Sequence, residues 1–138
     1  MLSVKYRILR EEKIMITSFK ELNVWKKSNE LTHRVFDLSN DFPREYSFDL
    51  TSQMRRAALS IPTNIAEGCA SVYSKEFLQF LNIARRSLSE TEYLLLFACE
   101  RGLIKTKEGS DLEGRVREIS KMLNGLIKSI RMNRTLNT

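Results

Sequence analysis

The sequence contains few of the residues that interrupt a chain, and this scarcity limits the possible folds. Only two prolines and five glycines occur among 138 residues, too few turn formers for a fold built from many short strands. The longest unbroken apolar run, 93–99, has seven residues, whereas a membrane-spanning helix needs about 20. We therefore expect one helical domain that is long enough to bury its own core, with no membrane partner.

Residue types that carry chemistry are also scarce. His33 is the only histidine, which leaves no zinc site built from several histidines. Cys69 and Cys99 lie far apart in the sequence with no Cys-x-x-Cys pair. So few and widely spaced cysteines are typical of proteins in the reducing cytoplasm. No glycine-rich phosphate loop occurs, and we expect no signal peptide. We therefore expect a cytoplasmic protein that is not an enzyme, with no catalytic residue, metal or cofactor.

Positive charge is concentrated toward the ends of the chain. The net charge is +6, and residues 115–134 carry six basic side chains against one acidic. Residues 1–16 carry four basic and two acidic side chains, while 17–114 carry 13 basic and 14 acidic. The basic excess predicts a surface that binds anions, or alternatively a solvated helix face that keeps the protein soluble.

Apolar residues recur at helical spacing in four segments. The first helix is expected to begin near Ser18, which opens a capping box, and the second at Asp49 as N-cap. The third should begin at Ser74 and close at Gly102, and the fourth should begin with a second capping box at 110–113. The expected buried positions are Leu22, Trp25, Val35 and Leu38 in the first helix; Leu50, Met54, Ala57, Ala58, Ile61 and Ile65 in the second; Phe77, Leu81, Ala84, Leu88, Thr91, Leu95 and Ala98 in the third; and Leu112, Val116, Ile119, Leu123, Leu126 and Ile130 in the fourth.

The spacing of these positions predicts how the helices pack. In the last two helices the apolar spacing alternates between four and three residues, which favours an antiparallel hairpin with coiled-coil-like packing. Four such helices with short connections predict an all-α fold, an antiparallel up-down-up-down four-helix bundle over residues 18–134. Residues 1–17 show no such pattern, so we expect an N-terminal arm that is extended or poorly ordered.

Segment 50–68, LTSQMRRAALSIPTNIAEG, places a polar stripe beside its apolar row. We interpret the stripe as a buried or interfacial hydrogen-bond network that specifies assembly, with Arg56 paired to Glu90. The alternative, in which Glu67 or Glu90 is a general base, lacks a nucleophile or a second titrating partner within the chain. The positions assigned to the network are Gln53, Arg56, Ser60, Pro62, Asn64, Glu67, Ser87 and Glu90.

Pro62 falls inside this helix. A proline has no backbone N–H, so the carbonyl of Ala58 loses its helical partner, normally at a cost of about 3 kcal/mol. We expect a kink at this point, with Ser60 or Asn64 helping to satisfy the exposed backbone.

The fourth helix carries basic residues opposite its apolar row. Their spacing of four and three residues over 14 positions makes a ridge about 21 Å long, which could follow a phosphate backbone. The helix has no aromatic residue for base stacking, so contact with the backbone rather than base readout is expected. The candidate phosphate contacts are Arg117, Lys121, Lys128 and Arg131, with Lys26 and Arg34 on the first helix.

Several segments resemble a known family. They are FKELNVWKKSNEL (19–31), LTSQMRRAALSIPTNIAEG (50–68), SKEFLQFLNIARRSLSETEYLL (74–95) and ISKMLNGLIKSI (119–130). Together they resemble the four-helix-bundle proteins encoded within 23S rRNA intervening sequences, to which the accessory variability proteins of diversity-generating retroelements are similar. The resemblance covers residues 18–132.

This resemblance implies a bundle assembled as a ring-shaped homopentamer. In the retroelement members it also implies a basic surface that binds nucleic acid and a reverse transcriptase, and it supplies no catalytic residue. Two functions follow as expectations. The first is a homo-oligomer that holds structured RNA or an RNA–DNA hybrid on its basic surface. The alternative is a protein-interaction scaffold for a partner enzyme such as a reverse transcriptase, with no direct role in nucleic-acid binding.

Met15 lies just before the first helix start, and the resemblance leaves out residues 1–16. We hypothesise that the natural protein starts at Met15. Intact-protein mass spectrometry of the natural product checks this: a chain that begins at Met15 is expected, and one that begins at Met1 would contradict the hypothesis.

Overall fold

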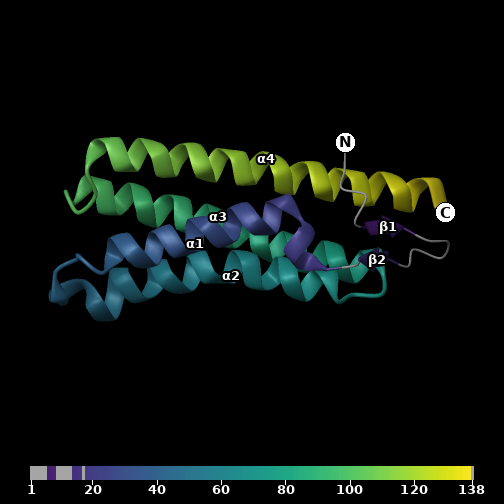
Figure 1. Ribbon diagram of the computed structural model, residues 1–138, viewed down its shortest axis with the longest axis horizontal. Helices are drawn as coiled ribbons and strands as arrows, with labels where there is room; N and C mark the ends of the chain where they lie inside the picture. Colours follow the sequence, from purple (N-terminus) through teal and green to yellow (C-terminus); the bar gives the residue numbers. More distant parts are fainter. Residues whose placement is uncertain (1–5, 9–13, 17, 138) are drawn as a thin grey trace.

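Four long helices make up most of the computed structural model, which describes residues 6–8, 14–16 and 18–137. They are α1 (Asn23–Ser39), α2 (Ser52–Cys69), α3 (Ser74–Glu100) and α4 (Thr106–Asn137). Successive helices run in opposite directions along one long axis, as the change of colour along each ribbon shows (Figure 1). The predicted all-α up-down-up-down bundle is confirmed.

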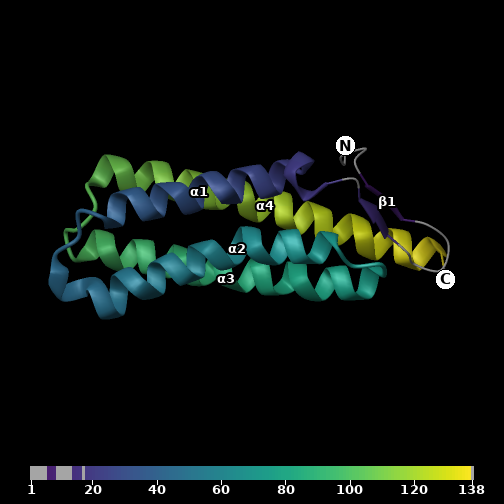
Figure 2. The ribbon, with the colours of Figure 1, turned by 60° about the horizontal axis from the view of Figure 1, so that its bottom comes forward.

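Each helix packs against its neighbours in sequence, and α1 also packs against α4, which closes the bundle (Figure 2). The apolar rows predicted for the last three helices are all buried, and so are Leu22 and Val35 near and in α1. Trp25 and Leu38 are partly buried against the core. Periodicity therefore identified the inward face of α2, α3 and α4, whereas in α1 it missed buried residues such as Val24, Leu31 and Thr32. None of the helices in the described residues combines the length and apolar character that membrane crossing requires.

The chain enters α1 through a short 3₁₀ turn rather than directly. Ser18 caps this turn, Phe19–Glu21, with its Oγ accepting the N–H of Lys20 at 3.2 Å. Leu22 is then extended, and α1 begins at Asn23, so the predicted start near Ser18 is wrong by more than one turn. The break buries Leu22 and lets the Phe19 ring meet Trp25 edge-on, with 4.9 Å between ring centroids.

Two other helix starts also differ from prediction. Asp49 is not an N-cap but lies within a wide π turn, Ser47–Thr51, where its carboxylate accepts the N–H of Leu50. Helix α4 begins at Thr106, one turn before the predicted capping box at 110–113. The earlier start places Glu108 in the first turn, where its negative charge suits the positive end of the helix dipole.

The end of α3 follows the prediction closely. Gly102 has a φ of +76°, the left-handed region that favours glycine at this position. The N–H of Gly102 donates to the Cys99 carbonyl (3.0 Å), and the N–H of Leu103 donates to the Ala98 carbonyl (2.9 Å). These two bonds form a Schellman motif, which satisfies carbonyls that the helix leaves open and turns the chain toward α4.

Part of the N-terminal arm is ordered as a hairpin. Strands β1 (Tyr6–Ile8) and β2 (Ile14–Ile16) pair antiparallel, with Tyr6 opposite Ile16. Strand β1 lies against α4, beside the C-terminal half of that helix (Figure 1). These six residues are extended, which is one of the two alternatives expected for the arm, while the rest of 1–17 lies outside the described residues. Helix α4 continues three residues beyond the predicted bundle boundary at 134.

Gly68 permits the close approach of α2 to α3. A Cβ added at Gly68 would lie 2.8 Å from Cδ1 of Phe77 and 3.0 Å from Cβ of Phe80. We expect Gly68→Ala to lower the free energy of unfolding by about 1–3 kcal/mol, because overpacking forces neighbouring atoms to shift. Urea denaturation followed by circular dichroism measures the change.

Gly125→Ala is the matched control, because nothing lies within 4 Å of a Cβ at that helical position. It should raise stability by up to about 1 kcal/mol through helix propensity. Equal effects of the two substitutions would show that the α2–α3 crossing does not require glycine.

Candidate nucleic-acid interface

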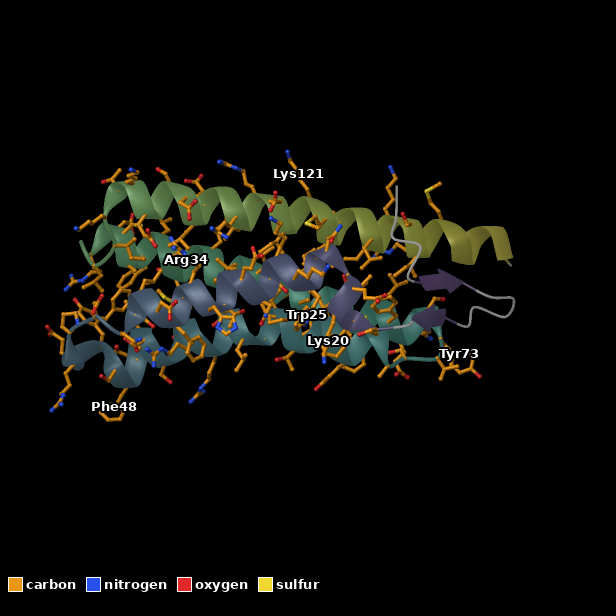
Figure 3. The ribbon with its side chains drawn as sticks, viewed as in Figure 1. Lys20, Trp25, Arg34, Phe48, Tyr73 and Lys121 are labelled. Carbon is orange, nitrogen blue, oxygen red and sulfur yellow. The ribbon has the colours of Figure 1, made fainter. Side chains whose placement is uncertain are left out.

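The predicted basic ridge lies on the outer face of α4. Arg117, Lys121, Lys128 and Arg131 are all exposed, and Lys121 points away from the bundle (Figure 3). Arg117 donates from Nη1 to Oε1 of Glu113 at 3.1 Å, so part of its charge is balanced within the helix. The stronger positive potential is therefore expected from Lys121 toward the C-terminal half of α4.

Helix α3 adds a basic residue to this half of the ridge. Arg85 joins Lys128 and Arg131 around a surface groove of about 360 Å³ between α3 and α4. Asn124, Ile127 and Met132 complete the lining. The sequence prediction missed Arg85, although its place directly after the buried Ala84 marks it as a flanking position that faces a neighbouring helix. A cluster of cations on two helices can contact phosphates from two sides.

The two candidates on α1 have different surroundings. Arg34 donates from Nη2 to Oε1 of Glu108 at 2.6 Å and also reaches Oδ2 of Asp111 at 3.4 Å. Its charge is thus balanced by two carboxylates of α4, and we leave it out of the interface. Lys26 is exposed, and its neighbour Lys27 pairs with Glu118 of α4 at 3.5 Å.

Arg34 belongs to a row of ion pairs that joins α1 to α4. Arg115 contacts Glu30 across the two helices at 3.7 Å and Asp111 within α4 at 3.0 Å. The side chains of these pairs are between 35% and 55% exposed, so water and salt screen each pair strongly. We call this row, together with the Lys27–Glu118 pair, the α1–α4 ion-pair row.

The polar stripe of α2 lies against α3, as the sequence suggested. Ser60 and Ser87 place their hydroxyl oxygens 2.8 Å apart across the two helices. Asn64 donates from Nδ2 to the Ser60 carbonyl (2.8 Å) and to Oγ of Ser60 (2.9 Å). Gln53 donates from Nε2 to Oε2 of Glu90 at 3.2 Å. Small hydroxyl groups thus make the centre of the contact, and longer polar side chains its exposed edge.

The predicted pair of Arg56 with Glu90 is not formed within the chain. Both residues are exposed, and the carboxylate of Glu90 accepts a hydrogen bond from Gln53 instead. Gln53 lies one helical turn before Arg56 on α2, and it is this earlier turn that stands opposite Glu90. Glu67 is also exposed. The hydrogen-bond network therefore contains fewer residues than the polar stripe of the sequence.

Pro62 is buried within α2, and its missing N–H is compensated from α1. Thr32 Oγ1 lies 3.0 Å from the Ala58 carbonyl, the acceptor that the proline leaves open, and 2.8 Å from the Ser28 carbonyl. The expectation that Ser60 or Asn64 would do this is wrong, because Asn64 bonds Ser60 rather than Ala58. Nothing in the local sequence marks Thr32, which precedes Ala58 by 26 positions.

The two cysteines are poor nucleophiles. Burial raises the pKa of the Cys69 thiol to about 12. Burial also raises the pKa of Cys99, with further contributions from the negative charges of Glu100 and Glu113. Both groups are therefore protonated at neutral pH, and a thiol reacts only as its thiolate. Within the described residues, no three side chains of His, Cys, Asp or Glu are gathered where they could hold a metal ion.

These features define a class: a four-helix-bundle protein whose surface carries a basic groove between its last two helices. The family model of the 23S rRNA-intervening sequence protein matches residues 20–125. The chain belongs to this family, and the resemblance noted in the sequence is confirmed.

A similar solved structure comes from Bacteroides thetaiotaomicron, a protein of unknown function from the S23 ribosomal protein family. It is 30% identical in sequence with a TM-score of 0.71, over 76% of this chain and 95% of that chain. No curated protein sequence matches the chain.

A double-mutant cycle tests the role of Thr32. Thr32→Val keeps the side-chain shape but leaves the Ala58 carbonyl unpaired, so the free energy of unfolding should fall by about 1–3 kcal/mol. In a Pro62→Ala background, the amide at position 62 can bond that carbonyl, and the cost of Thr32→Val should shrink. Chemical denaturation of all four proteins measures the coupling, and an equal cost in both backgrounds would contradict the assignment.

Proposed function

We propose that this protein is a non-enzymatic homo-oligomer that binds structured RNA or an RNA–DNA hybrid through a basic surface. The observation that carries the proposal is the groove where Arg85 of α3 meets Lys128 and Arg131 of α4, with Lys121 further along the same helix. Together these four residues form the basic surface. The family is named after the 23S rRNA intervening sequences that encode its members, so structured rRNA is the first RNA to test.

The proposed mechanism is electrostatic. Each phosphate neutralised by a lysine or arginine releases condensed counterions, so affinity should fall steeply as salt concentration rises. Helix α4 has no aromatic residue within its bounds, Thr106–Asn137, so stacking on bases does not contribute from this helix. Recognition of the shape and backbone of a folded RNA is the expected result.

Assembly would strengthen this weak recognition. The resemblance in sequence implies five copies, and five chains of net charge +6 would present several basic surfaces to one RNA. Linked sites bind with greater avidity than separate ones, because the second contact forms at high local concentration. We therefore propose cytoplasmic RNA binding by an oligomer, with each copy contributing a few phosphate contacts.

A second candidate function is a scaffold for a partner enzyme such as a reverse transcriptase. The observation in its favour is Phe48, which is 98% exposed in the π turn at one end of the bundle (Figure 3). A fully exposed aromatic side chain is a suitable anchor for a pocket on another protein. In that case the basic surface only keeps the protein soluble, and RNA affinity should not depend on salt.

Charge reversal separates the two functions. We expect Lys121→Glu combined with Lys128→Glu to weaken binding of a fluorescently labelled RNA hairpin and to lower the slope of log affinity against log salt by about 1 per lysine. Fluorescence anisotropy at about 50 and 200 mM salt measures both quantities.

The matched control is Lys75→Glu combined with Lys105→Glu, two exposed lysines outside the basic surface. It makes the same change in net charge and should leave most of the affinity intact. Equal losses in the two variants would show that net charge alone attracts RNA. An unchanged salt slope after the first substitution would contradict the proposal and favour the scaffold.

A further inference from the structure

A second groove opens between α3 and α4, near the turn that joins them and toward the end of the bundle opposite the two chain termini (Figure 2). Its volume is about 520 Å³, within the range of sites that hold ligands or partner side chains. Two carboxylates, Glu92 and Glu113, belong to its lining. We call it the acidic groove. The apolar part of its lining consists of Tyr93, Leu95, Leu96, Cys99, Ile104 and Val116.

Small residues on both helices keep the acidic groove open. Ser89 on α3 and Ser110 on α4 line it with short hydroxyl side chains. Gly109 has no side chain, and a Cβ at this position would lie 2.7 Å from Sγ of Cys99. The two helices therefore approach each other closely at Gly109, and no large side chain covers the groove from above.

Large apolar side chains stand exposed beside this hollow. Tyr93 is 58% exposed and Leu96 is 54% exposed, whereas Leu95 and Val116 below them are buried. Exposed apolar groups with a charged rim are typical of a surface that contacts another protein.

The charge of the rim is negative on both helices. Position 109 stands opposite Cys99, so in the antiparallel pair Glu92 is level with position 116, three residues from Glu113. The two carboxylates thus flank the same stretch of the groove from opposite sides. Glu113 also accepts a hydrogen bond from Arg117, whereas Glu92 has no ion pair among the residues that the structure describes.

We propose that the acidic groove binds an amphipathic helix of a partner protein, with an apolar stripe and basic residues on both flanks of that stripe. The stripe covers Tyr93 and Leu96, and the basic residues pair with Glu92 and Glu113. From Ser89 to Cys99 the groove follows ten residues of α3, about 15 Å, which matches about ten residues of helix. A helix satisfies its own backbone hydrogen bonds, so apolar anchors one turn apart can enter such a groove.

The sign of the charge makes this occupant different from RNA, because carboxylates repel phosphates. Glu113 and Lys128 are 15 residues apart on α4, about 22 Å along the helix. A helix in the acidic groove therefore leaves Arg85, Lys128 and Arg131 open to RNA. The inference does not rest on the proposed RNA binding. It is also compatible with the implied ring of five, in which each copy would carry one acidic groove.

A synthetic peptide with the stated chemistry tests the groove. The probe is a fluorescently labelled peptide of about 14 residues, with leucines at helical spacing on one face and lysines on both flanks. Fluorescence anisotropy at about 150 mM salt, where distant charges are screened, should show saturable binding. The same peptide with glutamate in place of every lysine should not bind, because its charges then meet Glu92 and Glu113.

Two variants of the protein place the peptide in the groove. Glu92→Gln combined with Glu113→Gln should weaken binding about tenfold, through the loss of two charge pairs at the edge of the contact. Ser89→Trp adds a large side chain at an exposed position of the lining. This side chain should fill the groove and abolish binding.

Each variant has a matched control at exposed positions outside the groove. Glu45→Gln combined with Glu76→Gln makes the same change in net charge, and Gln79→Trp adds the same side chain to α3. Both controls should bind the peptide as the wild-type protein does. Circular dichroism shows whether each variant is folded, and an excess of the RNA hairpin should not displace the peptide.

Three results would overturn the inference: no binding of the lysine peptide, equal binding by the groove variants and their controls, or displacement of the peptide by RNA. A change of particle mass in the groove variants, measured by analytical ultracentrifugation, would also overturn it and would assign the groove to contacts between copies of this chain. Lys121 and Lys128 are intact in every variant. Failure of the acidic groove therefore leaves the proposed RNA binding open, and peptide binding can be measured whether or not RNA binds.

Discussion

The rest of the bundle depends on how the chain accommodates Pro62. A proline in the second half of α2 leaves the Ala58 carbonyl without its helical donor, and a buried unpaired carbonyl is costly. The hydroxyl of Thr32 supplies the donor from α1, and the guanidinium of Arg55 adds hydrogen bonds from α2 to Ser39 and to the Phe36 carbonyl of α1. These bonds together fix the register between α1 and α2. Helix α2 is bound on its other side by the Ser60–Ser87 contact with α3. It thus fixes the position of both neighbours.

Close packing of α2 on α3 follows from the small residues between them. Ser60, Ser87 and Gly68 allow the helices to approach until a single added methyl group would touch Phe77. Hydroxyl groups at such a contact are satisfied by each other and restrict the helices to one alignment, whereas apolar residues alone would allow sliding. Arg85 lies on α3 only two residues before Ser87. The contact that fixes Ser87 therefore also fixes the position of Arg85 beside the basic groove.

Much of the fold could be predicted from the sequence, because a buried row repeats every three or four residues and leaves a strong pattern. The heptads of α3 and α4, the Schellman end at Gly102 and the basic ridge all have such local signals. Helix starts were less predictable, since Ser18 caps a 3₁₀ turn instead of α1, and Asp49 and Ser110 lie inside longer helical segments. Partners across helices were not predictable at all. Thr32 for the Ala58 carbonyl, Gln53 rather than Arg56 for Glu90, and Arg85 beside Lys128 each depend on a register that no single segment encodes.

The α1–α4 ion-pair row makes the attachment of α1 unequal on its two flanks. Toward α2, the helix is held by apolar packing, by the buried bond of Thr32 and by hydrogen bonds from Arg55 to neutral acceptors, and ionic strength affects these contacts little. Toward α4, it is held in part by charges that lie within reach of water, and their attraction weakens as the Debye length shortens. The contact between α1 and α2 should therefore persist at high salt concentration, whereas the contact between α1 and α4 should loosen as the salt concentration rises.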